Sequence, residues 1–560
     1  MWDRKMKRAL CLFLIYWATV GMHAIPAMPE IWRTLRLKDD TEVRAQLKGD
    51  EFCHYWRTDD GRNYIKSGEE YVEANEITMS NRAQSLRTTR QASAMSRRVA
   101  IGERTHYTGK KKGLVILAEF KDVKFNASNN KAKYEKILNA EGYTTSEGFK
   151  GSVADYFKAQ SGGEFELEFD VFGPVQLANN QSYYGENDAN GSDKRAVNMI
   201  VEACKAIDSQ VNFRDYDWDD DYEVDEVYVV YAGKGEATSG NDDTIWPHMF
   251  YLKVANINLF LDKVRINTYA CSNELTSSGK IEGIGGICHE FSHCLGYPDL
   301  YDTANGVVGS LQSYDIMDSG GFNGSGFVPA GFSAYEKWMA GWIDLTVLSN
   351  QNVTVSNLKP VSEGGSGYII YNDGHPDEYY ILENRQQTNW DKYLPGRGLM
   401  ITHVDYDAQL WYLNIPNSVL TSTSNYVRNY GYPTNDHARL VIFRADNNAS
   451  SSYTSMSHDL YPYQANDSLT ATSKPAAIYY NPNMLDEKFL QGGILNITQN
   501  SDRTMNFVYR ASDEDTGISE VHPDSERTPS VIYDLQGRRF MEGHLPKGIY
   551  IENGKVKVRG

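Results

Sequence analysis

The pattern of hydrophobic and polar residues divides this chain of 560 residues into regions that we expect to fold differently. Near the N-terminus, residues 42–47 alternate polar and apolar positions, as a strand does when one of its faces is in water. Turn-forming sequences follow at residues 59–61 and 67–68. Residues 25–76 are therefore predicted to form a small β-rich module.

A second region, residues 113–346, combines strand and helix patterns. Residues 113–120 are almost wholly apolar and predict a buried strand, whereas residues 165–171 alternate and predict a strand with one wet face. Residues 153–159 and 281–295 carry helical patterns, and the second is the stronger. Strands mixed with a few helices are typical of an α+β unit.

The third region, residues 347–510, consists almost wholly of short strands and turns. Residues 379–383, 398–404 and 440–443 are examples of its strand patterns. Several short strands with regular turn signals between them predict a β-sandwich. An acidic, serine-rich spacer follows and leads to a short C-terminal β segment at residues 520–560.

The N-terminus has the pattern of a secretory signal peptide. Lys7 and Arg8 precede an apolar run at residues 9–21, and Ala24 offers a small residue for cleavage. The run is too short for a comfortable membrane span, so we expect residues 1–24 to be a signal peptide and the mature protein to be exported. A buried N-terminal helix is the alternative interpretation. No other stretch of the sequence is long and apolar enough to cross a bilayer.

Residues 77–112 have the composition of a flexible linker. Ser, Thr, Gln and Ala dominate there, arginines recur throughout, and few apolar side chains are available for burial. An Arg-rich linker that follows a small module is a natural site for activating cleavage. A mere spacer is the alternative interpretation.

Composition narrows the classes of partner. The formal net charge is −18, which disfavours nucleic acid, because a phosphate backbone attracts basic surfaces. An acidic balance fits an extracellular protein and also one that collects calcium. Of the 6 cysteines, Cys11 would leave with the signal peptide, so an odd number remains and at least one thiol is free or bonded to another chain.

The segment His289-Glu290-Phe291-Ser292-His293 carries the candidate chemistry. Residues four apart lie on one face of a helix, so His289 and His293 can place two imidazoles on one Zn²⁺. Glu290 can then reach a water on that metal and accept its proton during attack on a peptide carbonyl. The alternative interpretation is two ordinary histidines on a helix.

A catalytic zinc needs a third protein ligand and one open position. Gly296 can end the helix and turn the chain, which would bring Asp299 back toward the metal. This spacing is that of the metzincin motif with Asp in place of the third His. Asp299 is therefore the favoured ligand. Asp302 is a nearby competitor, and Glu336 is the alternative because some zincins use a distant Glu.

Two further features accompany this motif. Metzincins place a Met in a tight turn beneath the metal, and Met317 has the right position for it, although an ordinary core Met is the alternative. Acidic side chains at alternate positions between residues 217 and 225 are suited to wrap Ca²⁺, with a solvated acidic turn as the alternative. The predicted calcium ligands are Asp217, Asp219, Asp221 and Asp225.

Residues 283–302, which contain the histidine motif, resemble the immune inhibitor A family of secreted metallopeptidases. Further matches lie in order on both sides, at residues 152–157, 161–163, 183–185, 245–248, 337–342, 382–385 and 403–405. The resemblance implies a signal peptide, an inhibitory propeptide, a metzincin-like catalytic domain and trailing β domains. Within that propeptide, Cys53 could ligate zinc in the zymogen, although a structural role is simpler.

The last residues, 532–560, resemble the C-terminal sorting domains of the type nine secretion system of Bacteroidetes-like bacteria. That resemblance implies transport across the outer membrane and makes the secretion machinery an expected partner. One more small β module is an equal alternative.

Together these features predict a multidomain, exported zymogen with a small β-rich propeptide, an α+β zincin or metzincin-like catalytic domain and a β-sandwich. The expected activity is zinc-dependent hydrolysis of peptide bonds in extracellular proteins, with calcium as a second ion. The expected location is outside the cell or on a bacterial cell surface. A non-catalytic binding protein and a hydrolase of non-peptide bonds are the rivals. Intact Glu290 disfavours the first, and the family resemblance disfavours the second.

Overall fold

The structure, a computed structural model, describes most of the chain. The described residues are 23–24, 26–28, 31–50, 54–68, 70–75, 106–188, 192–304, 311–448, 455–511, 532–534, 539–540, 548–552 and 555–559. Those up to residue 511 belong to one compact unit and those from residue 532 to a second. Most of the predicted signal peptide, the predicted linker up to residue 105, and Cys53 lie outside the described residues.

A six-stranded sheet organises the central region. Its strands, in spatial order, are β1 (His23–Ala24), β10 (His248–Tyr251), β13 (Thr268–Leu275), β9 (Val227–Lys234), β7 (Gly109–Glu119) and β8 (Phe165–Gln176). The strands β8, β7, β9 and β13 are parallel, whereas β10 is antiparallel to β13, and β1 is antiparallel to β10 at the sheet edge. A short hairpin of β11 (Leu259–Leu261) and β12 (Val264–Ile266) stands apart from this sheet.

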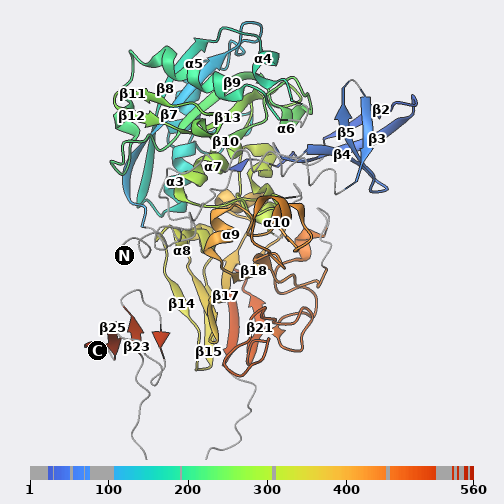
Figure 1. Ribbon diagram of the computed structural model, residues 1–560. Helices are drawn as coiled ribbons and strands as arrows, with labels where there is room; N and C mark the ends of the chain where they lie inside the picture. The colour runs from blue at the N-terminus through green and yellow to red at the C-terminus, as the bar shows by residue number, and fades with distance from the viewer. Residues whose placement is uncertain are drawn as a thin grey trace, which may run out of the picture. The chain divides into compact units, whose positions relative to one another are not determined.

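Helices accompany the sheet and confirm the predicted mixture of α and β structure. They are α2 (Lys131–Asn139), α3 (Val153–Gln160), α4 (Gln181–Gly185), α5 (Ala196–Ile207), α6 (Glu236–Ser239), α7 (Gly285–Ser292) and α8 (Ala334–Met339). In Figure 1, α5 lies on one side of the sheet, and α3 and α7 lie on the other. Strand β9 is buried along nearly its whole length, as expected for a strand that is covered on both faces.

The predicted strands and the first predicted helix of this region are present, with shifted ends. The alternating stretch at residues 165–171 lies in β8, and the helix predicted at residues 153–159 is α3. Strand β7 begins at Gly109, earlier than predicted, because its first residues pair with residues 165–168 of β8.

The helix predicted at residues 281–295 is shorter in the structure. Helix α7 covers only Gly285–Ser292, and a 3₁₀ turn at His293–Leu295 continues it. Close backbone packing sets its start, since a Cβ atom on Gly285 would lie 1.9 Å from the carbonyl oxygen of Gly321. A glycine at this position therefore lets α7 lie in the interior of the central region, where nearly all of its side chains are buried.

Two sheets of the following region share one hydrophobic core. The five-stranded sheet comprises β14 (Leu345–Val347), β16 (Gly367–Asn372), β17 (His375–Arg385), β18 (Gly398–Asp405) and β19 (Leu440–Ile442), and the four-stranded sheet comprises β15 (Val353–Leu358), β22 (Met505–Arg510), β21 (Gly493–Gln499) and β20 (Leu469–Thr470). Ile370 and Ile401 of the first sheet belong to the same buried cluster as Ile494 and Phe507 of the second. Sheets packed on a common core in this way form a β-sandwich.

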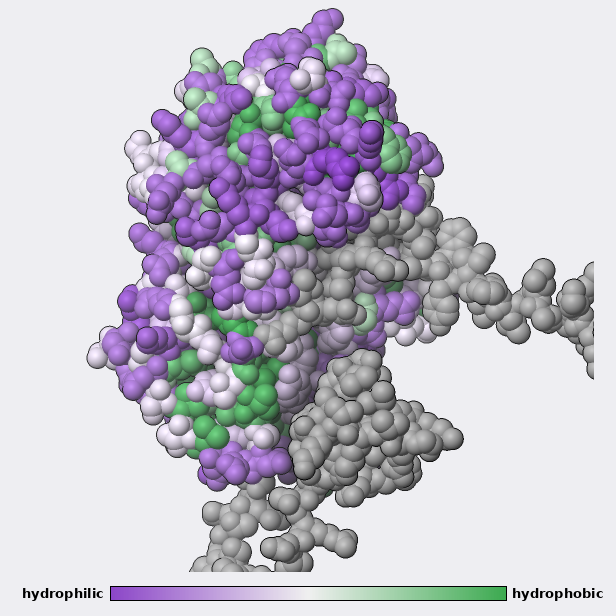
Figure 2. Space-filling model, turned by 90° about the vertical axis from the view of Figure 1, so that its left-hand side faces the viewer, coloured by the Kyte–Doolittle hydropathy of each residue, from purple (hydrophilic) through white to green (hydrophobic). Residues whose placement is uncertain are grey.

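The surface of this first unit differs between its two main parts. On the face shown in Figure 2, hydrophilic residues dominate the upper part, which holds the six-stranded sheet. Hydrophobic residues are more frequent in the lower part, which holds the two smaller sheets.

Between β18 and β19 the chain forms α9 (Ala408–Tyr412) and α10 (Asn425–Tyr430).

The ends of the chain contribute β structure only, as far as the structure describes them. The N-terminal module is a five-stranded antiparallel sheet of β2 (Trp32–Arg36), β3 (Glu42–Gly49), β4 (His54–Thr58), β5 (Asn63–Ser67) and β6 (Glu70–Ala74). The second unit holds β24 (Arg539–Phe540), β23 (Ile532–Asp534), β25 (Gly548–Glu552) and β26 (Lys555–Arg559) in one sheet. Within the described part of the chain, no helix has the length and apolar character needed to span a bilayer.

Candidate metal centre

The two histidines of the motif lie on successive turns and present the same ring nitrogen. His289 belongs to α7, and His293 begins the 3₁₀ turn that follows it. The Nδ1 atom of His289 lies 2.7 Å from the carbonyl oxygen of Ile316, and Nδ1 of His293 lies 2.7 Å from that of Tyr297. A carbonyl can only accept, so each Nδ1 donates its proton and each Nε2 offers a lone pair, as metal-binding imidazoles do.

Asp299 completes a convergent set of donor atoms. Gly296 ends the 3₁₀ turn in the left-handed conformation, at a φ of 84°, and reverses the chain direction. The Oδ1 atom of Asp299 then lies 3.2 Å from His289 Nε2 and 3.7 Å from His293 Nε2, and all three side chains are buried. Two imidazole nitrogens and a carboxylate oxygen are donors that suit zinc, so these residues fit the ion that the motif implies.

Asn414 holds the carboxylate of Asp299 in place, and sequence reasoning missed it. Its Nδ2 donates to Asp299 Oδ2 over 2.7 Å, and its Oδ1 accepts the backbone N–H of Asp299 over 2.6 Å. Nearby, Asn417 Nδ2 donates to the carbonyl of Leu300 over 2.7 Å. The segment after α9 therefore orients the loop that carries Asp299. Asn414 is 115 residues away from Asp299 in sequence, and no local pattern marks it.

Glu290 lies beside the two histidines. Its carboxylate, His289 and His293 offer ligand-type atoms within 4.8 Å of one another, and its side chain is fully buried. Tyr228 of β9 is a neighbour. Burial raises the pKa of the Tyr228 hydroxyl well above its usual value, and the charge of Glu290 raises it further. The carboxylate of Glu290 is thus buried next to the two histidines.

Met317 occupies the turn beneath His289. The carbonyl that receives the His289 proton belongs to Ile316, the residue before it. The Met317 N–H donates to Asp315 Oδ1 over 2.8 Å, and its carbonyl accepts the N–H of Leu300 over 2.7 Å. The buried methionine therefore belongs to a turn that contacts both the first histidine and the loop of Asp299.

The competing ligands are engaged elsewhere. Glu336 Oε2 accepts the N–H and the hydroxyl of Ser333, over 2.7 and 3.0 Å, and so caps α8. Burial raises the pKa of the Glu336 carboxyl well above its usual value, and the nearby Asp315 carboxylate adds to this. Asp302 Oδ1 accepts the N–H of Ala304 over 3.1 Å in a local turn.

The predicted calcium ligands are only partly gathered. Asp217, Asp219 and Asp225 offer carboxylate oxygens within 4.8 Å of one another. Asp221 is not in that group, and its Oδ1 accepts the N–H of Glu223 over 2.8 Å. Exposed acidic turns often have this form without an ion, so calcium stays a prediction here.

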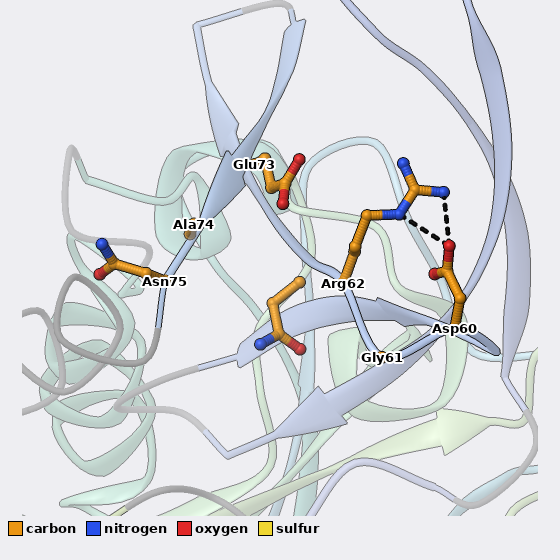
Figure 3. A pocket seen from close by; sticks show the side chains of 7 residues that line it. Asp60, Gly61, Arg62, Glu73, Ala74 and Asn75 are labelled. Atoms are coloured by element: carbon orange, nitrogen blue, oxygen red, sulfur yellow. Dashed lines mark hydrogen bonds and ion pairs between the residues drawn. The ribbon is translucent and has the colours of Figure 1, made fainter.

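A hollow of about 500 Å³ lies in the N-terminal module, and neither His289 nor His293 lines it. Figure 3 shows it between the turn at residues 60–63 and the end of β6 at residues 73–75. Arg62 points toward Asp60 at its rim and pairs with it over 2.8 Å. Charged and polar side chains dominate its lining, and we assign it no part in the chemistry.

Comparison with known proteins finds relatives of the central region. Residues 103–344 match the model of the immune inhibitor A peptidase M6 catalytic domain. The pre-pro-metalloprotease PrtV of Vibrio cholerae serotype O1 is 29% identical over 234 residues, which cover 36% of this chain and 25% of that protein. Immune inhibitor A of Bacillus thuringiensis subsp. alesti is 26% identical over 268 residues, or 41% of this chain and 39% of that protein.

The chain thus spans only about a quarter and about two fifths of the lengths of these two curated relatives. The matched segment nevertheless contains both histidines, Glu290 and Asp299. Through residues 103–344, the chain therefore resembles the catalytic domain of the immune inhibitor A-like metallopeptidases.

Proposed function

We propose that this chain is a secreted, zinc-dependent endopeptidase that hydrolyses peptide bonds of extracellular proteins and is made as a zymogen. The observation that carries the proposal is the convergence of His289 Nε2, His293 Nε2 and Asp299 Oδ1 beside the buried Glu290. The family match over the same residues supports it.

In this proposal His289, His293 and Asp299 hold the zinc. The distances of 3.2 and 3.7 Å favour Asp299 over Glu336, whose carboxylate caps α8. When bound, zinc lowers the pKa of a water toward neutrality and polarises the substrate carbonyl. Glu290 would accept a proton from the attacking water and deliver it to the leaving amine.

The remaining side chains position the reacting groups. The carbonyls of Ile316 and Tyr297 hold the histidine protons on Nδ1, and this keeps both Nε2 lone pairs directed at the metal. Asn414 binds one carboxylate oxygen of Asp299, and this leaves Oδ1 directed toward the histidines. A zincin-like fold for the central region follows from this proposal.

Export and latency are proposals that rest on the sequence. The N-terminal signal pattern supports secretion, or display on a bacterial surface if residues 532–560 engage an outer-membrane secretion machinery. The small antiparallel sheet of residues 32–74 fits a propeptide, and the V. cholerae relative is named as a pre-pro form.

Hydrolysis of casein or gelatin tests the proposal. The chain is cut within residues 77–105, and activity is measured for the wild type, a chelator-treated sample and the Glu290→Ala variant, with zinc content from elemental analysis. We expect hydrolysis by the wild type only, and zinc retained by Glu290→Ala, because Glu290 is not one of the three proposed ligands.

Three results would contradict the proposal. Zinc-loaded wild type that hydrolyses neither protein would favour the non-catalytic binding protein. Full activity in Glu290→Ala would remove the proposed general base. Hydrolysis of an ester or amide outside peptides, without cleavage of casein, would favour the hydrolase of non-peptide bonds.

A further inference from the structure

The N-terminal module packs against one face of the central region, beside α6 (Figure 1). We call this surface the α6 face. It consists of Glu236, Ala237, Gly240, Asp242 and Trp246. Four kinds of contact join it to the module: a shared apolar cluster, a glycine under an aromatic ring, an imidazole–carboxyl contact and a polar rim.

The apolar contact unites both sides in one small core. Ala237 and Trp246 of the α6 face belong to the same buried cluster as Leu35, Leu47 and Trp56 of the module. Each of these side chains is at most 3% exposed. Burial of apolar surface to this degree is the main favourable term in the association of protein surfaces.

The absence of a side chain at Gly240 makes room for the module. It ends α6 in the left-handed conformation, at a φ of 64°. A Cβ atom at this position would lie 2.9 Å from the indole ring of Trp56. The glycine therefore serves the turn and also lets Trp56 lie directly on the backbone of the α6 face.

A contact between an imidazole and a buried carboxyl group lies beside this glycine. His54 Nε2 of the module is 3.0 Å from Glu236 Oε1, and the His54 ring stacks on Trp246 with ring centres 4.9 Å apart. Glu236 is 1% exposed, and Asn187 Nδ2 donates to the same oxygen over 2.9 Å. A carboxyl group removed from water in this way is costly unless it is hydrogen-bonded, and the His54 imidazole that reaches Glu236 Oε1 comes from the module.

Polar contacts surround this centre. Lys66 Nζ lies 2.6 Å from Asp242 Oδ2, and Arg33 donates to the carbonyl of Gly240 over 3.1 Å. The N–H of Met28 donates to the carbonyl of Ala237 over 3.1 Å. An apolar centre with a polar rim is the usual anatomy of a specific interface.

We propose that the α6 face is a docking surface for residues 31–75 and that it still holds the module after the linker is cut. All the contacts described above are made by residues 28–66 of the N-terminal region, so a cut within residues 77–105 would break none of them. Cutting and release are then separate steps of activation. The order of these steps rests on the proposed zymogen, whereas the docking surface itself does not.

The test uses the full chain with Glu290→Ala, which prevents self-digestion, cut within residues 77–105 by limited trypsin treatment. Size-exclusion chromatography at micromolar concentration then shows whether the module travels with the rest of the chain. We expect co-elution. Adding Gly240→Ala or His54→Ala should raise the dissociation constant of the module by roughly tenfold or more, through the clash with Trp56 or the loss of the partner of Glu236.

Gly279→Ala is the matched control for Gly240→Ala. Gly279 has a similar φ of 74°, but nothing lies within 4 Å of its added Cβ atom, so it carries the backbone strain without the contact. Its module should co-elute as in the parent chain. Thermal melts of the uncut variants separate weakened docking from misfolding.

Two results would overturn the proposal. One is a parent chain whose module separates as soon as the linker is cut. The other is a folded Gly240→Ala variant that retains its module as tightly as Gly279→Ala. Because the readout is binding in an inactive background, failure of the peptidase proposal would leave this result unaffected.

Discussion

Among the described residues, the two clusters of candidate ion ligands have different surroundings. At the metal centre, the side chains of His289, His293 and Asp299 are buried, and each uses its second polar atom for a hydrogen bond to a fixed group. The second cluster consists of Asp217, Asp219 and Asp225, and we call its segment the aspartate loop. There Asp219 is exposed, and Asp217 accepts the N–H groups of two later residues in the loop.

This difference separates ligands that are already oriented from carboxylates that also bond the backbone of their own loop. A ligand whose second atom is already held keeps its orientation before the ion arrives, so little freedom is lost on binding. A carboxylate that turns the chain must share its oxygens between backbone and ion. The spacing of ligand-type residues is therefore a weaker indicator of a metal site than the hydrogen bonds that orient those residues.

The largest expected effect tests which carboxylate completes the metal centre. Asp299→Ala should lose zinc and lower activity by at least about a hundredfold, because the metal supplies several kcal/mol of transition-state stabilisation. Glu336→Gln, which can still accept the hydrogen bonds of Ser333, should keep its zinc. Elemental analysis and casein hydrolysis measure both. Zinc lost from Glu336→Gln but kept by Asp299→Ala would reverse the assignment.

The next effect tests the packing that holds the metal centre rigid. Gly285→Ala places a Cβ atom 1.9 Å from the carbonyl of Gly321, and backbone cannot move aside as a flexible side chain can. The free energy of unfolding should fall by about 1–3 kcal/mol or more, measured by denaturant titration. Gly321→Ala is the control, because its Cβ atom would lie at an ordinary 3.5 Å from the carbonyl of Gly285. Equal stability of the two variants would refute close packing at α7.

Sequence reasoning could reach those parts of the candidate site whose geometry is local. The four-residue spacing of His289 and His293 settles their common direction on one helical stretch, and Gly296 marks the turn that returns Asp299. Asn414 could not be found this way, since its contact with Asp299 depends on how distant segments pack.

Prediction of the fold likewise depends on whether a feature is set by local pattern or by contacts between distant segments. Alternation and apolar runs predicted the strands β3, β7 and β8, because each depends on which faces of a single strand are buried. The late start of the predicted helix at α7 depends instead on the approach of Gly321, and the α6 face depends on contact with a separate module. Such tertiary contacts leave little trace in local periodicity.

A smaller effect tests the support of the metal centre. Asn414→Ala removes the donor to Asp299 Oδ2, and loss of such a supporting hydrogen bond typically weakens metal affinity by about 10–100-fold. Competition with a chromogenic chelator measures this change. Asn417→Ala is the control, since Asn417 contacts the carbonyl of Leu300 in the same loop without touching the carboxylate. Unchanged zinc affinity in Asn414→Ala would remove the distinction drawn above.

The smallest effect asks whether the aspartate loop is an ion site at all. If Asp217, Asp219 and Asp225 bind Ca²⁺, calcium at ten times its dissociation constant should add about 1.4 kcal/mol to the free energy of unfolding. Asp219→Asn should abolish this gain without harming the calcium-free protein, because Asp219 is the exposed member of the group. Thermal melts with calcium or a calcium chelator measure both. If calcium changes the melting temperature of neither the wild type nor the variant, the loop is a solvated turn. The aspartate cluster would then differ from the candidate zinc ligands in function as well as in surroundings.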